Sequence, residues 1–189
     1  MITAHCIVKN EENFVWYAIN SILDYMDKII IWDTGSTDKT VEIIKSIGSP
    51  KISFEEKGPV SPQEFAKLRG EMVKMTDTDW IFILDGDEIW SKAGIEEIIG
   101  LITKYGNSKD LIVSPVKMLI GDIYHYQEER AGRYNVKGKT GHFNVRAVRN
   151  FDGLRVKGFF GNEGYTDINN TDIQNLPEER IIFAKNNYL

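Results

Sequence analysis

The sequence predicts an α/β fold, a three-layer α/β/α sandwich of Rossmann-like type on a mainly parallel sheet, with antiparallel strands in its second half. Two observations predict it. Short apolar segments alternate with helix-like segments up to about residue 105, as in βαβ units. After residue 110, strand-like segments follow one another without helices. The length of 189 residues, of which 42% are hydrophobic and 27% charged, fits one globular domain over 1–189 with halves 1–105 and 106–189.

The first half contains four apolar, β-branched segments that are predicted to be strands: 2–8, 28–33, 51–55 and 80–84. A helix is predicted after each of them, because apolar residues recur there at helical spacing. These residues are Phe14, Val15, Ala18, Ile19, Ile22, Leu23 and Met26, then Val41, Ile44 and Ile47, then Phe65, Leu68, Met72 and Met75, and finally Ile95, Ile98, Ile99 and Ile102. The first helix is expected to span 10–26, and the second to be capped by Ser36 or Thr37 and ended by Gly48.

The second half is predicted to contain a long strand over Leu111–Ile120 and then a polar, aromatic loop over 121–141. The segments 143–149 and 154–160 alternate apolar and polar residues, so they are expected to pair antiparallel around the turn between them. A strand-like tail at 180–184 closes the sequence. The sequence stops abruptly after that tail, so we expect the natural chain to continue.

The charge balance bears on the partners of the protein. The chain has 23 Lys and Arg against 28 Asp and Glu, a net charge of −5, which argues against sequence-general nucleic-acid binding. Its single cysteine, Cys6, can form no intrachain disulfide and fits a reducing, cytoplasmic location. Its apolar runs are far shorter than the ~20 residues that span a bilayer, and no signal peptide is visible at the N-terminus.

The strongest chemical signal is the run Asp85-Gly86-Asp87-Glu88 at the end of an apolar strand. Carboxylates this close repel one another unless a cation lies among them, and divalent hard cations take oxygen ligands. The alternative is a solvated Asp-Gly turn. In parallel sheets, however, ligands bind beyond the carboxyl ends of the strands, and this position favours a metal or ligand site.

Polar side chains also follow the first two predicted strands. They are Lys9, Asn10 and Glu11 after the first strand, and Asp33 and Gly35 after the second. Residues of these types also cap helices, which is the alternative interpretation. Since carboxyl ends of parallel strands meet at one edge of a sheet, we expect these residues to lie near Asp85.

Together these motifs resemble the family-2 glycosyltransferases of GT-A fold, over roughly residues 2–100. The segments that carry the resemblance are 10–12, 31–40, Arg69 and 80–88. The resemblance implies that Asp85 and Asp87 form the DxD motif of the family and hold Mn²⁺ or Mg²⁺ against the diphosphate of a nucleotide sugar. It further implies nucleotide contacts from Lys9, Asn10, Glu11, Asp33, Gly35, Arg69, Asp85 and Gly86.

The implied reaction moves a hexosyl or deoxyhexosyl group from a nucleotide sugar, with UDP favoured, to a hydroxyl of a carbohydrate or other acceptor, with inversion. By the same resemblance, residues 1–105 bind the donor and 106–189 face the acceptor. Many members of the family have two consecutive acids after the second strand. Here the second position is Thr34, which leaves the base of the donor open.

Such a transfer expels a nucleoside diphosphate, and a bound cation stabilises the charge that develops on it. Asp87 would contribute to this catalytic step through the metal. The acceptor hydroxyl needs a general base, because its own pKa is too high. Glu163, between glycines in Gly161-Asn162-Glu163-Gly164, is the candidate for that base. Asp167 and Asp172 are the alternatives.

Three features have weaker functional interpretations. Trp90 could stack on a sugar ring, although packing in the core is favoured. His142 could be a further metal ligand, although a structural role is favoured. A polar aromatic segment could form a lid over the donor or a solvated surface loop, and its residues are Tyr124, His125, Tyr126, Arg130, Arg133 and Tyr134.

Three other classes of protein compete with this interpretation. A dehalogenase-type phosphatase has an Asp-x-Asp near the start of its chain, followed by Thr or Val where Ile89 stands here. A nucleotidyltransferase has a glycine-rich basic loop after its first strand, and Lys9-Asn10-Glu11-Glu12 contains no glycine. A catalytically silent nucleotide-sugar-binding module would bind the donor without turnover.

Overall fold

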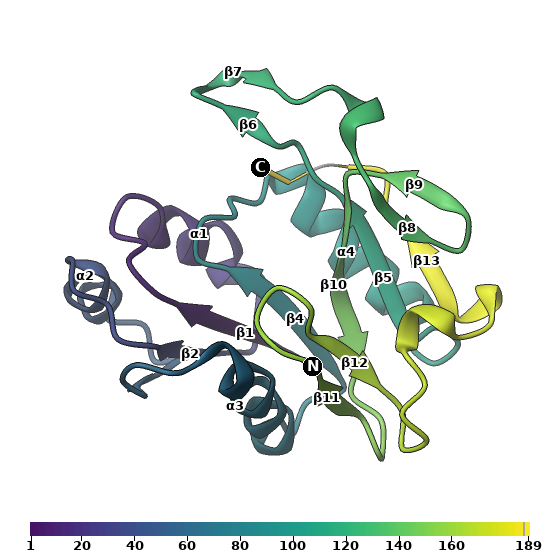
Figure 1. Cartoon of the computed structure of the whole chain (residues 1–189), viewed down its shortest axis with the longest axis horizontal. Helices are drawn as coiled ribbons and strands as arrows, with labels where there is room; N and C mark the ends of the chain where they lie inside the picture. The colour runs from purple at the N-terminus through teal and green to yellow at the C-terminus, as the bar shows by residue number, and fades with distance from the viewer. Residues whose placement is uncertain (187) are drawn as a thin grey trace.

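The core of the protein is one seven-stranded sheet with the order β13-β5-β10-β4-β1-β2-β3, so strands from both halves of the chain share it (Figure 1). The computed structural model describes residues 1–186 and 188–189. The strands are β1 (Ile2–Val8), β2 (Lys28–Asp33), β3 (Ile52–Glu56), β4 (Trp80–Asp85), β5 (Leu111–Pro115), β10 (Phe143–Arg149) and β13 (Ile181–Phe183). Strand β10 is antiparallel to both neighbours and the other adjacent pairs are parallel, which confirms the predicted fold class.

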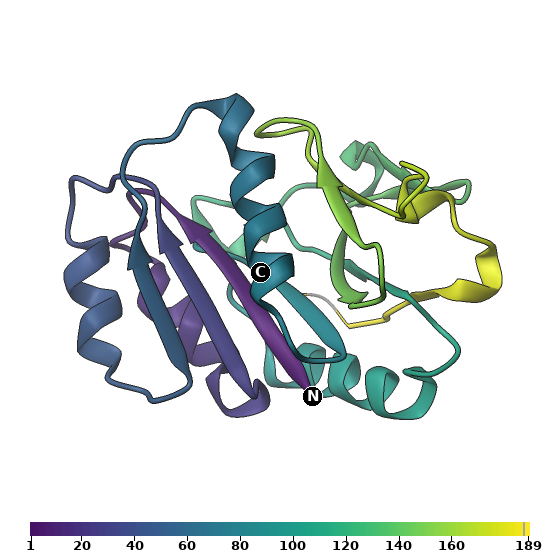
Figure 2. The same ribbon diagram turned by 90° about the horizontal axis from the view of Figure 1, so that it is seen from below.

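Helices cover both faces of the sheet, but unequally (Figure 2). Three helices pack on one face: α1 (Val15–Ile22), α2 (Thr40–Ile47) and α4 (Lys92–Tyr105). The other face carries α3 (Pro62–Met75) and a two-stranded ribbon of β11 (Arg155–Lys157) and β12 (Gly164–Thr166). The second outer layer is therefore half helix and half ribbon.

Side-chain alternation in β4 connects this packing to the site. Phe82 and Leu84 belong to the core under α1 and α4, whereas Ile81 and Ile83 belong to the core under the ribbon. Successive side chains of a strand point to opposite faces, so Asp85 continues the row of Ile81 and Ile83. Its carboxylate thus emerges on the face that carries α3 and the ribbon.

The first helix is shorter than the predicted 10–26. It begins at Val15 and ends at Ile22, and a 3₁₀ turn, η1 (Leu23–Tyr25), follows it. Phe14, which the apolar stripe placed in the core, is 47% exposed. The segment before the helix is a loop because Asn10 has a left-handed backbone (φ +58°), a conformation that Asn tolerates but a helix does not.

The predicted cap of α2 was also wrong. The N-cap position is Lys39, and the Asp38 carboxylate accepts the bond from the Thr40 backbone N–H at 3.0 Å. The Ser36 hydroxyl instead accepts a bond from the Asn10 backbone N–H at 2.8 Å. Gly48 does end the helix, with a left-handed φ of +64°.

The second half departs most from prediction. The predicted strand over 111–120 ends at Pro115, although the backbone N–H of Val116 still donates to the His142 carbonyl at 2.9 Å. The predicted loop over 121–141 contains most of two hairpins, in which β6 (Leu119–Ile120) pairs with β7 (Asp122–Tyr126) and β8 (Tyr134–Val136) with β9 (Lys139–Gly141). Short 3₁₀ turns complete this half: η2 (Glu129–Ala131), η3 (Ile173–Asn175) and η4 (Glu178–Arg180).

The segment 154–160 does not pair with β10, contrary to prediction. The turn before it is held against the segment between α3 and β4, because the Asn150 amide donates to the Thr76 and Thr78 carbonyls at 3.0 Å. The chain then crosses to the α3 face, where β11 pairs with β12. The tail forms β13, a strand parallel to β5. In the part of the chain that the structure describes, no helix is long and apolar enough to cross a membrane.

Candidate active site

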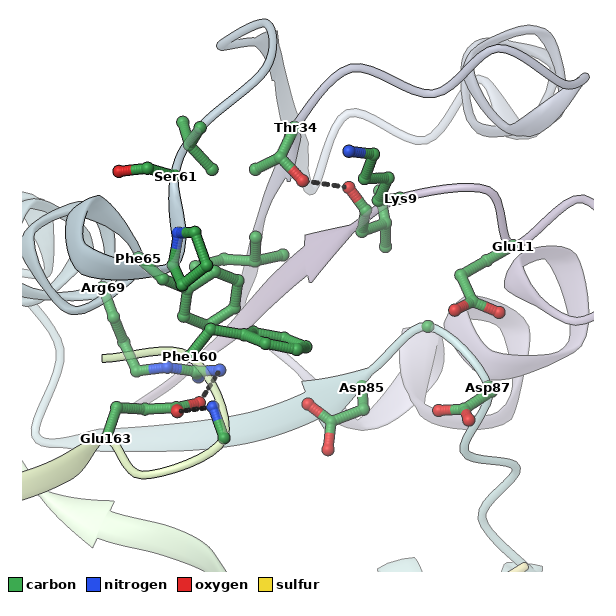
Figure 3. Close-up of a pocket in the computed structure, with 16 residues that line it drawn as sticks. Lys9, Glu11, Thr34, Ser61, Phe65, Arg69, Asp85, Asp87, Phe160 and Glu163 are labelled. Atoms are coloured by element: carbon green, nitrogen blue, oxygen red, sulfur yellow. Dashed lines mark hydrogen bonds and ion pairs between the residues drawn. The ribbon is translucent and has the colours of Figure 1, made fainter. Parts of the chain in front are cut away.

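The ends of three parallel strands meet at one edge of the sheet. Val8 at the end of β1 pairs in register with Asp33 of β2, and Ile7 pairs with Asp85 of β4. A cavity of about 550 Å³ lies beyond this edge (Figure 3). It is lined by Ile7, Val8, Lys9, Glu11, Thr34, Val60, Ser61, Pro62, Phe65, Arg69, Asp85, Gly86, Asp87, Phe160, Gly161 and Glu163. This is the position that the topology of a parallel sheet predicts for a ligand.

Seven of the ten predicted site residues line the cavity: Lys9, Glu11, Arg69, Asp85, Gly86, Asp87 and Glu163. Asn10, Asp33 and Gly35 are not among its lining residues. Asp33 is 1% exposed, and its carboxylate accepts bonds from the backbone N–H groups of Gly35 (3.1 Å) and Ser36 (2.8 Å). The Asn10 side-chain oxygen accepts from the Thr37 backbone N–H at 2.8 Å. In this structure the three residues shape the loops that support the cavity.

One wall of the cavity is acidic. The carboxylates of Glu11, Asp85 and Asp87 lie on the same side of the cavity in Figure 3. Burial and the nearby charges of Asp87, Asp38 and Asp85 together raise the pKa of Glu11 to about 7. These carboxylates therefore repel one another in the absence of a cation.

Gly86 allows this wall to form. A Cβ atom at this position would lie 2.8 Å from Cγ of Glu11 and 3.0 Å from Cγ1 of Val8. Any larger residue would displace Glu11 from Asp87, since real Cβ contacts are not this short. The absence of a side chain at Gly86 thus allows the loop after β4 to pack closely against the loop after β1.

Arg146 is the principal residue that the sequence analysis missed. Its guanidinium is buried, donates to Asp85 Oδ2 at 3.0 Å and contacts the Glu88 carboxylate. Burial acts to raise the pKa of Asp85, but Arg146 and Arg69 outweigh it and hold that pKa below its ordinary value. Burial raises the pKa of Glu88 to about 8, although Arg146 opposes this shift. The sequence signal was a charged residue within the otherwise strand-like segment 143–149.

The residues present fit a divalent cation that is shared with a ligand. Across residues 1–186 and 188–189, no three His, Cys, Asp or Glu side chains converge as a complete protein metal site. Mg²⁺ is commonly held by one or two carboxylates together with phosphate oxygens and water, rather than by a full protein cage. Asp85 and Asp87 beside an open cavity supply the first part of such a ligand set.

The opposite wall combines a buried cation with a carboxylate. Arg69 on α3 is 5% exposed, and its Nη2 lies 3.6 Å from Glu163 Oε1. Glu163 Oε2 also accepts a bond from the Gly161 backbone N–H at 2.8 Å. Among the described residues, the Nε and Nη1 atoms of Arg69 are buried without a hydrogen-bond partner. Because Arg69 also lines the cavity, its positive charge lies beside any anionic group that binds there.

Apolar residues complete this wall, and the sequence did not indicate them. Phe65 of α3 and Phe160 of the loop after β11 pack edge to face, with ring centroids 5.0 Å apart and planes at 72°. The Phe160 backbone N–H donates to the Pro62 carbonyl at 2.8 Å, which holds the loop against α3. Phe160 itself is 61% exposed and leaves an aromatic surface at the mouth of the cavity.

The alternative candidates lie elsewhere. The Asp167 carboxylate accepts from the Asn169 and Thr171 backbone N–H groups at 2.8 Å, and Asp172 pairs with Lys157 at 3.1 Å. Neither Asp167 nor Asp172 lines the 550 Å³ cavity.

Trp90, His142 and the aromatic segment do not line the 550 Å³ cavity either. Trp90 is 3% exposed and stacks on Tyr188, with centroids 4.5 Å apart, which confirms core packing. The ring of His142 hydrogen-bonds to the Glu128 carbonyl at 3.0 Å, in keeping with a structural role. Of the aromatic segment, Tyr134 lines a second cavity of about 240 Å³.

The family profile of Glycosyl transferase family 2 matches residues 4–155. The chain therefore belongs to this family, an enzyme class distinct from the dehalogenase-type phosphatases and nucleotidyltransferases. It is 32% identical over 145 residues to the SPbeta prophage-derived glycosyltransferase SunS of Bacillus subtilis, and this match covers 73% of the chain and 32% of SunS. The chain thus spans about a third of that relative.

Solved structures agree with the fold. The structure of S. aureus TarS 1–349 superposes with a TM-score of 0.58 at 14% identity, over 79% of this chain and 47% of TarS 1–349. Its complex with UDP superposes with a TM-score of 0.55 at 16% identity, over 68% of this chain and 38% of that chain. Glucosyl-3-phosphoglycerate synthase from Mycobacterium tuberculosis, in complex with Mn²⁺, UDP-glucose and phosphoglyceric acid, superposes with a TM-score of 0.51 at 22% identity. The match covers 62% of this chain and 44% of that chain. These likenesses identify the GT-A type of fold.

Proposed function

We propose that this chain is a metal-dependent glycosyltransferase domain, single over 1–189, that moves a sugar from a UDP-sugar to a hydroxyl acceptor with inversion. The observation that carries the proposal is the convergence of Glu11, Asp85 and Asp87 with Arg69 around one cavity at the carboxyl ends of β1 and β4. The site offers carboxylates for a cation and a buried guanidinium for phosphate, which are the two partners that a leaving diphosphate needs.

Asp85 and Asp87 would hold Mn²⁺ or Mg²⁺, which neutralises the charge that develops on the departing diphosphate. Arg69 lines the cavity, and its guanidinium is proposed to donate to a diphosphate oxygen bound there. Glu11 is proposed to contact the bound cation through a water molecule. Lys9 and Thr34 line the same cavity near the end of β1, and we propose that they contact the nucleotide together with the Asp33 loop.

Glu163 is proposed to be the general base. It lines the 550 Å³ cavity and also the adjoining 240 Å³ cavity, as do Arg69 and Asp85. A donor in the first cavity and an acceptor in the second would therefore meet at this carboxylate. The hydrogen bond from Gly161 and the ion pair with Arg69 hold it in place, so the acceptor hydroxyl has a fixed oxygen to which it can transfer its proton.

The choice of UDP has a separate basis. Proteins of similar fold have been solved in complex with UDP, with UDP-GlcNAc, or with Mn²⁺ and UDP-glucose. The acid at the end of β2, Asp33, lies at the base of the loop that borders the cavity, and Thr34 lines it. We therefore propose a UDP-sugar, with hexosyl or deoxyhexosyl transfer to a carbohydrate or other hydroxyl.

The test is release of UDP from a panel of UDP-sugars, each incubated with Mn²⁺ and candidate hydroxyl acceptors. We expect acceptor-stimulated UDP release that stops when EDTA removes the metal. Binding of UDP-sugars without turnover, with every acceptor in the panel, would favour the silent binding module instead. Turnover unaffected by EDTA would overturn the metal-dependent mechanism.

A further inference from the structure

A buried polar cluster lies directly behind the acidic wall and has no part in the function proposed above. Arg146 contacts Asp85 Oδ2 at 3.0 Å through Nη2 and Tyr188 Oη at 2.7 Å through Nε, and it also pairs with Glu88. Arg146, Glu88 and Tyr188 are each less than a tenth exposed. We call these three residues the Arg146 cluster.

The position of Arg146 follows from an irregularity in β10. The pairing of β10 with β5 shifts register between Val145 and Ala147, so Arg146 occupies the extra position. Bulges of this kind re-aim a side chain, and they are frequent beside active sites. On its other side β10 pairs with β4, where Ala147 lies opposite Phe82. The guanidinium of Arg146 can therefore reach Asp85 at the end of β4.

The end of the described chain supports the cluster from behind. Tyr188 stacks on Trp90 with its ring plane at 11°, and its hydroxyl accepts from Arg146. Leu189 and Ile89 exchange two backbone hydrogen bonds, of 2.6 and 2.9 Å. The segment that follows Asp85 and Asp87 is thus tied to residues about a hundred positions later in the chain.

The side chains of Asp85 and Asp87 consequently differ in conformational freedom. Arg146 holds Oδ2 of Asp85, while the Asp85 side chain is 45% exposed and lines the cavity. Asp87 is exposed, and among the described residues no hydrogen bond or ion pair holds its carboxylate. A carboxylate that is already oriented loses less side-chain entropy when it binds a metal.

We propose that Arg146 is a positioning residue that orients Asp85 as a single-oxygen ligand and thereby strengthens divalent-cation binding at the cavity. This inference rests on the proposed function, because it assumes that Asp85 binds the cation. An arginine suits this role because its planar fork reaches Asp85, Glu88 and Tyr188 at once, which a compact lysine ammonium cannot do.

The test is titration of Mn²⁺ into the full chain in the presence of UDP. The Kd for Mn²⁺ is measured by calorimetry and, independently, from the EPR signal of free Mn²⁺. Arg146→Lys keeps the positive charge near the cation and removes the fork. Loss of one hydrogen bond to a charged group predicts a rise of about tenfold in the Mn²⁺ Kd. Tyr188→Phe removes only the hydroxyl behind Arg146, so we expect a rise of about twofold to threefold.

The matched control is Arg149→Lys, on the same strand. Arg149 pairs with buried Asp110 at 2.6 Å, and Asp110 also pairs with Arg180, away from the cavity. We expect its Mn²⁺ Kd to stay within about twofold of the wild type, since only the distant pair changes. Thermal unfolding of each variant shows whether it is folded. If Arg146→Lys does not fold, the Mn²⁺ Kd of Tyr188→Phe decides the test.

The outcomes separate the two proposals. If the wild type binds Mn²⁺ with UDP, and Arg146→Lys and Tyr188→Phe bind it equally well, the positioning role is wrong and the proposed function stands. If Arg149→Lys weakens binding as much as Arg146→Lys, the effect is general destabilisation, and the positioning role is again wrong. If the wild type itself binds no Mn²⁺ with UDP, the metal-dependent function is overturned.

Discussion

The two walls of the cavity are built in different ways. The acidic wall stands on the ends of β1 and β4, central strands of the sheet, and Leu84 beneath it is fully buried. The opposite wall consists of α3 and the loop that carries Phe160 and Glu163, and this loop belongs to the two-stranded ribbon rather than to the sheet. Phe160 is mostly exposed, in contrast to the packed residues of β4.

The two walls are therefore suited to different roles in ligand binding. A wall backed by the sheet can hold charged groups at fixed separations, as a cation and a diphosphate require. A wall made from a surface loop can differ between relatives without disturbing the core, as specificity for a sugar and an acceptor requires. The predictions below test this contrast by changing one wall at a time.

Glu163→Gln should have the largest effect on turnover. Removal of a general base lowers the rate by about 10²–10⁴-fold, whereas the amide retains the size of the side chain and donor binding should persist. The measurements are the rate of UDP release and, separately, the calorimetric Kd for the UDP-sugar. Glu178→Gln, which changes an acid remote from the cavity, is the control. A wild-type rate in Glu163→Gln, with loss of activity in Asp172→Asn, would transfer the role to Asp172.

Gly86→Ala tests the acidic wall alone. The new methyl group would meet Cγ of Glu11 at 2.8 Å, so Glu11 must move and the carboxylate arrangement changes. We expect the Kd for Mn²⁺ with UDP to rise about tenfold, equivalent to about 1.4 kcal/mol. Gly100→Ala on α4 is the control, because a Cβ there meets nothing within 4 Å. Equal affinities in the two variants would contradict the importance of this close approach.

Phe160→Ala tests the loop wall alone. The edge-to-face pair with Phe65 would be lost, and such pairs contribute about 0.5–1.5 kcal/mol. Because Phe160 is mostly exposed, we expect the KM for the donor to rise a few-fold while the melting temperature changes little. Phe159→Ala, which removes an exposed phenylalanine outside the cavity lining, should leave the KM unchanged. A large fall in the melting temperature would show that the loop is part of the core.

The smallest expected effect is on pH dependence. The pKa of Glu11 in the folded protein is about 7, above its ordinary value of 4.5, so the folded state binds this proton more tightly than the unfolded chain does. Its contribution to stability is complete below pH 4.5 and is lost as the pH rises through 7. Without metal, the melting temperature of the wild type minus that of Glu11→Gln should therefore fall over this range. A difference in melting temperature that stays constant over this pH range would contradict the pKa shift of Glu11.

The contrast between the two walls also explains which site residues could be predicted from the sequence. The acidic wall follows from alternation of strands and helices, since parallel strands bring their carboxyl ends to one edge. Glu11, Asp85 and Asp87 accordingly line the same cavity. Asp33 shows the limit of this reasoning, because an acid after a strand can bind a ligand or close a turn, and here its carboxylate accepts bonds from the next loop.

The other residues depend on features that no local pattern encodes. Arg146 reaches Asp85 through a register shift within β10, and a shift by one residue is invisible in the alternation of apolar and polar positions. Phe160 reaches the cavity because the segment after β10 leaves the sheet, whereas its alternating pattern predicted pairing with β10. Long-range pairing therefore decides these positions.

The most direct test of the central claim is calorimetric titration of UDP into the chain with and without Mn²⁺, for the wild type and Asp87→Ala. Asp152→Ala, which removes the same charge from an exposed turn, is the control. We predict that the wild type and the control bind UDP tightly only with Mn²⁺, and that Asp87→Ala loses this metal-dependent binding. An unchanged, metal-dependent affinity in Asp87→Ala would contradict a cation held by the acids at the end of β4.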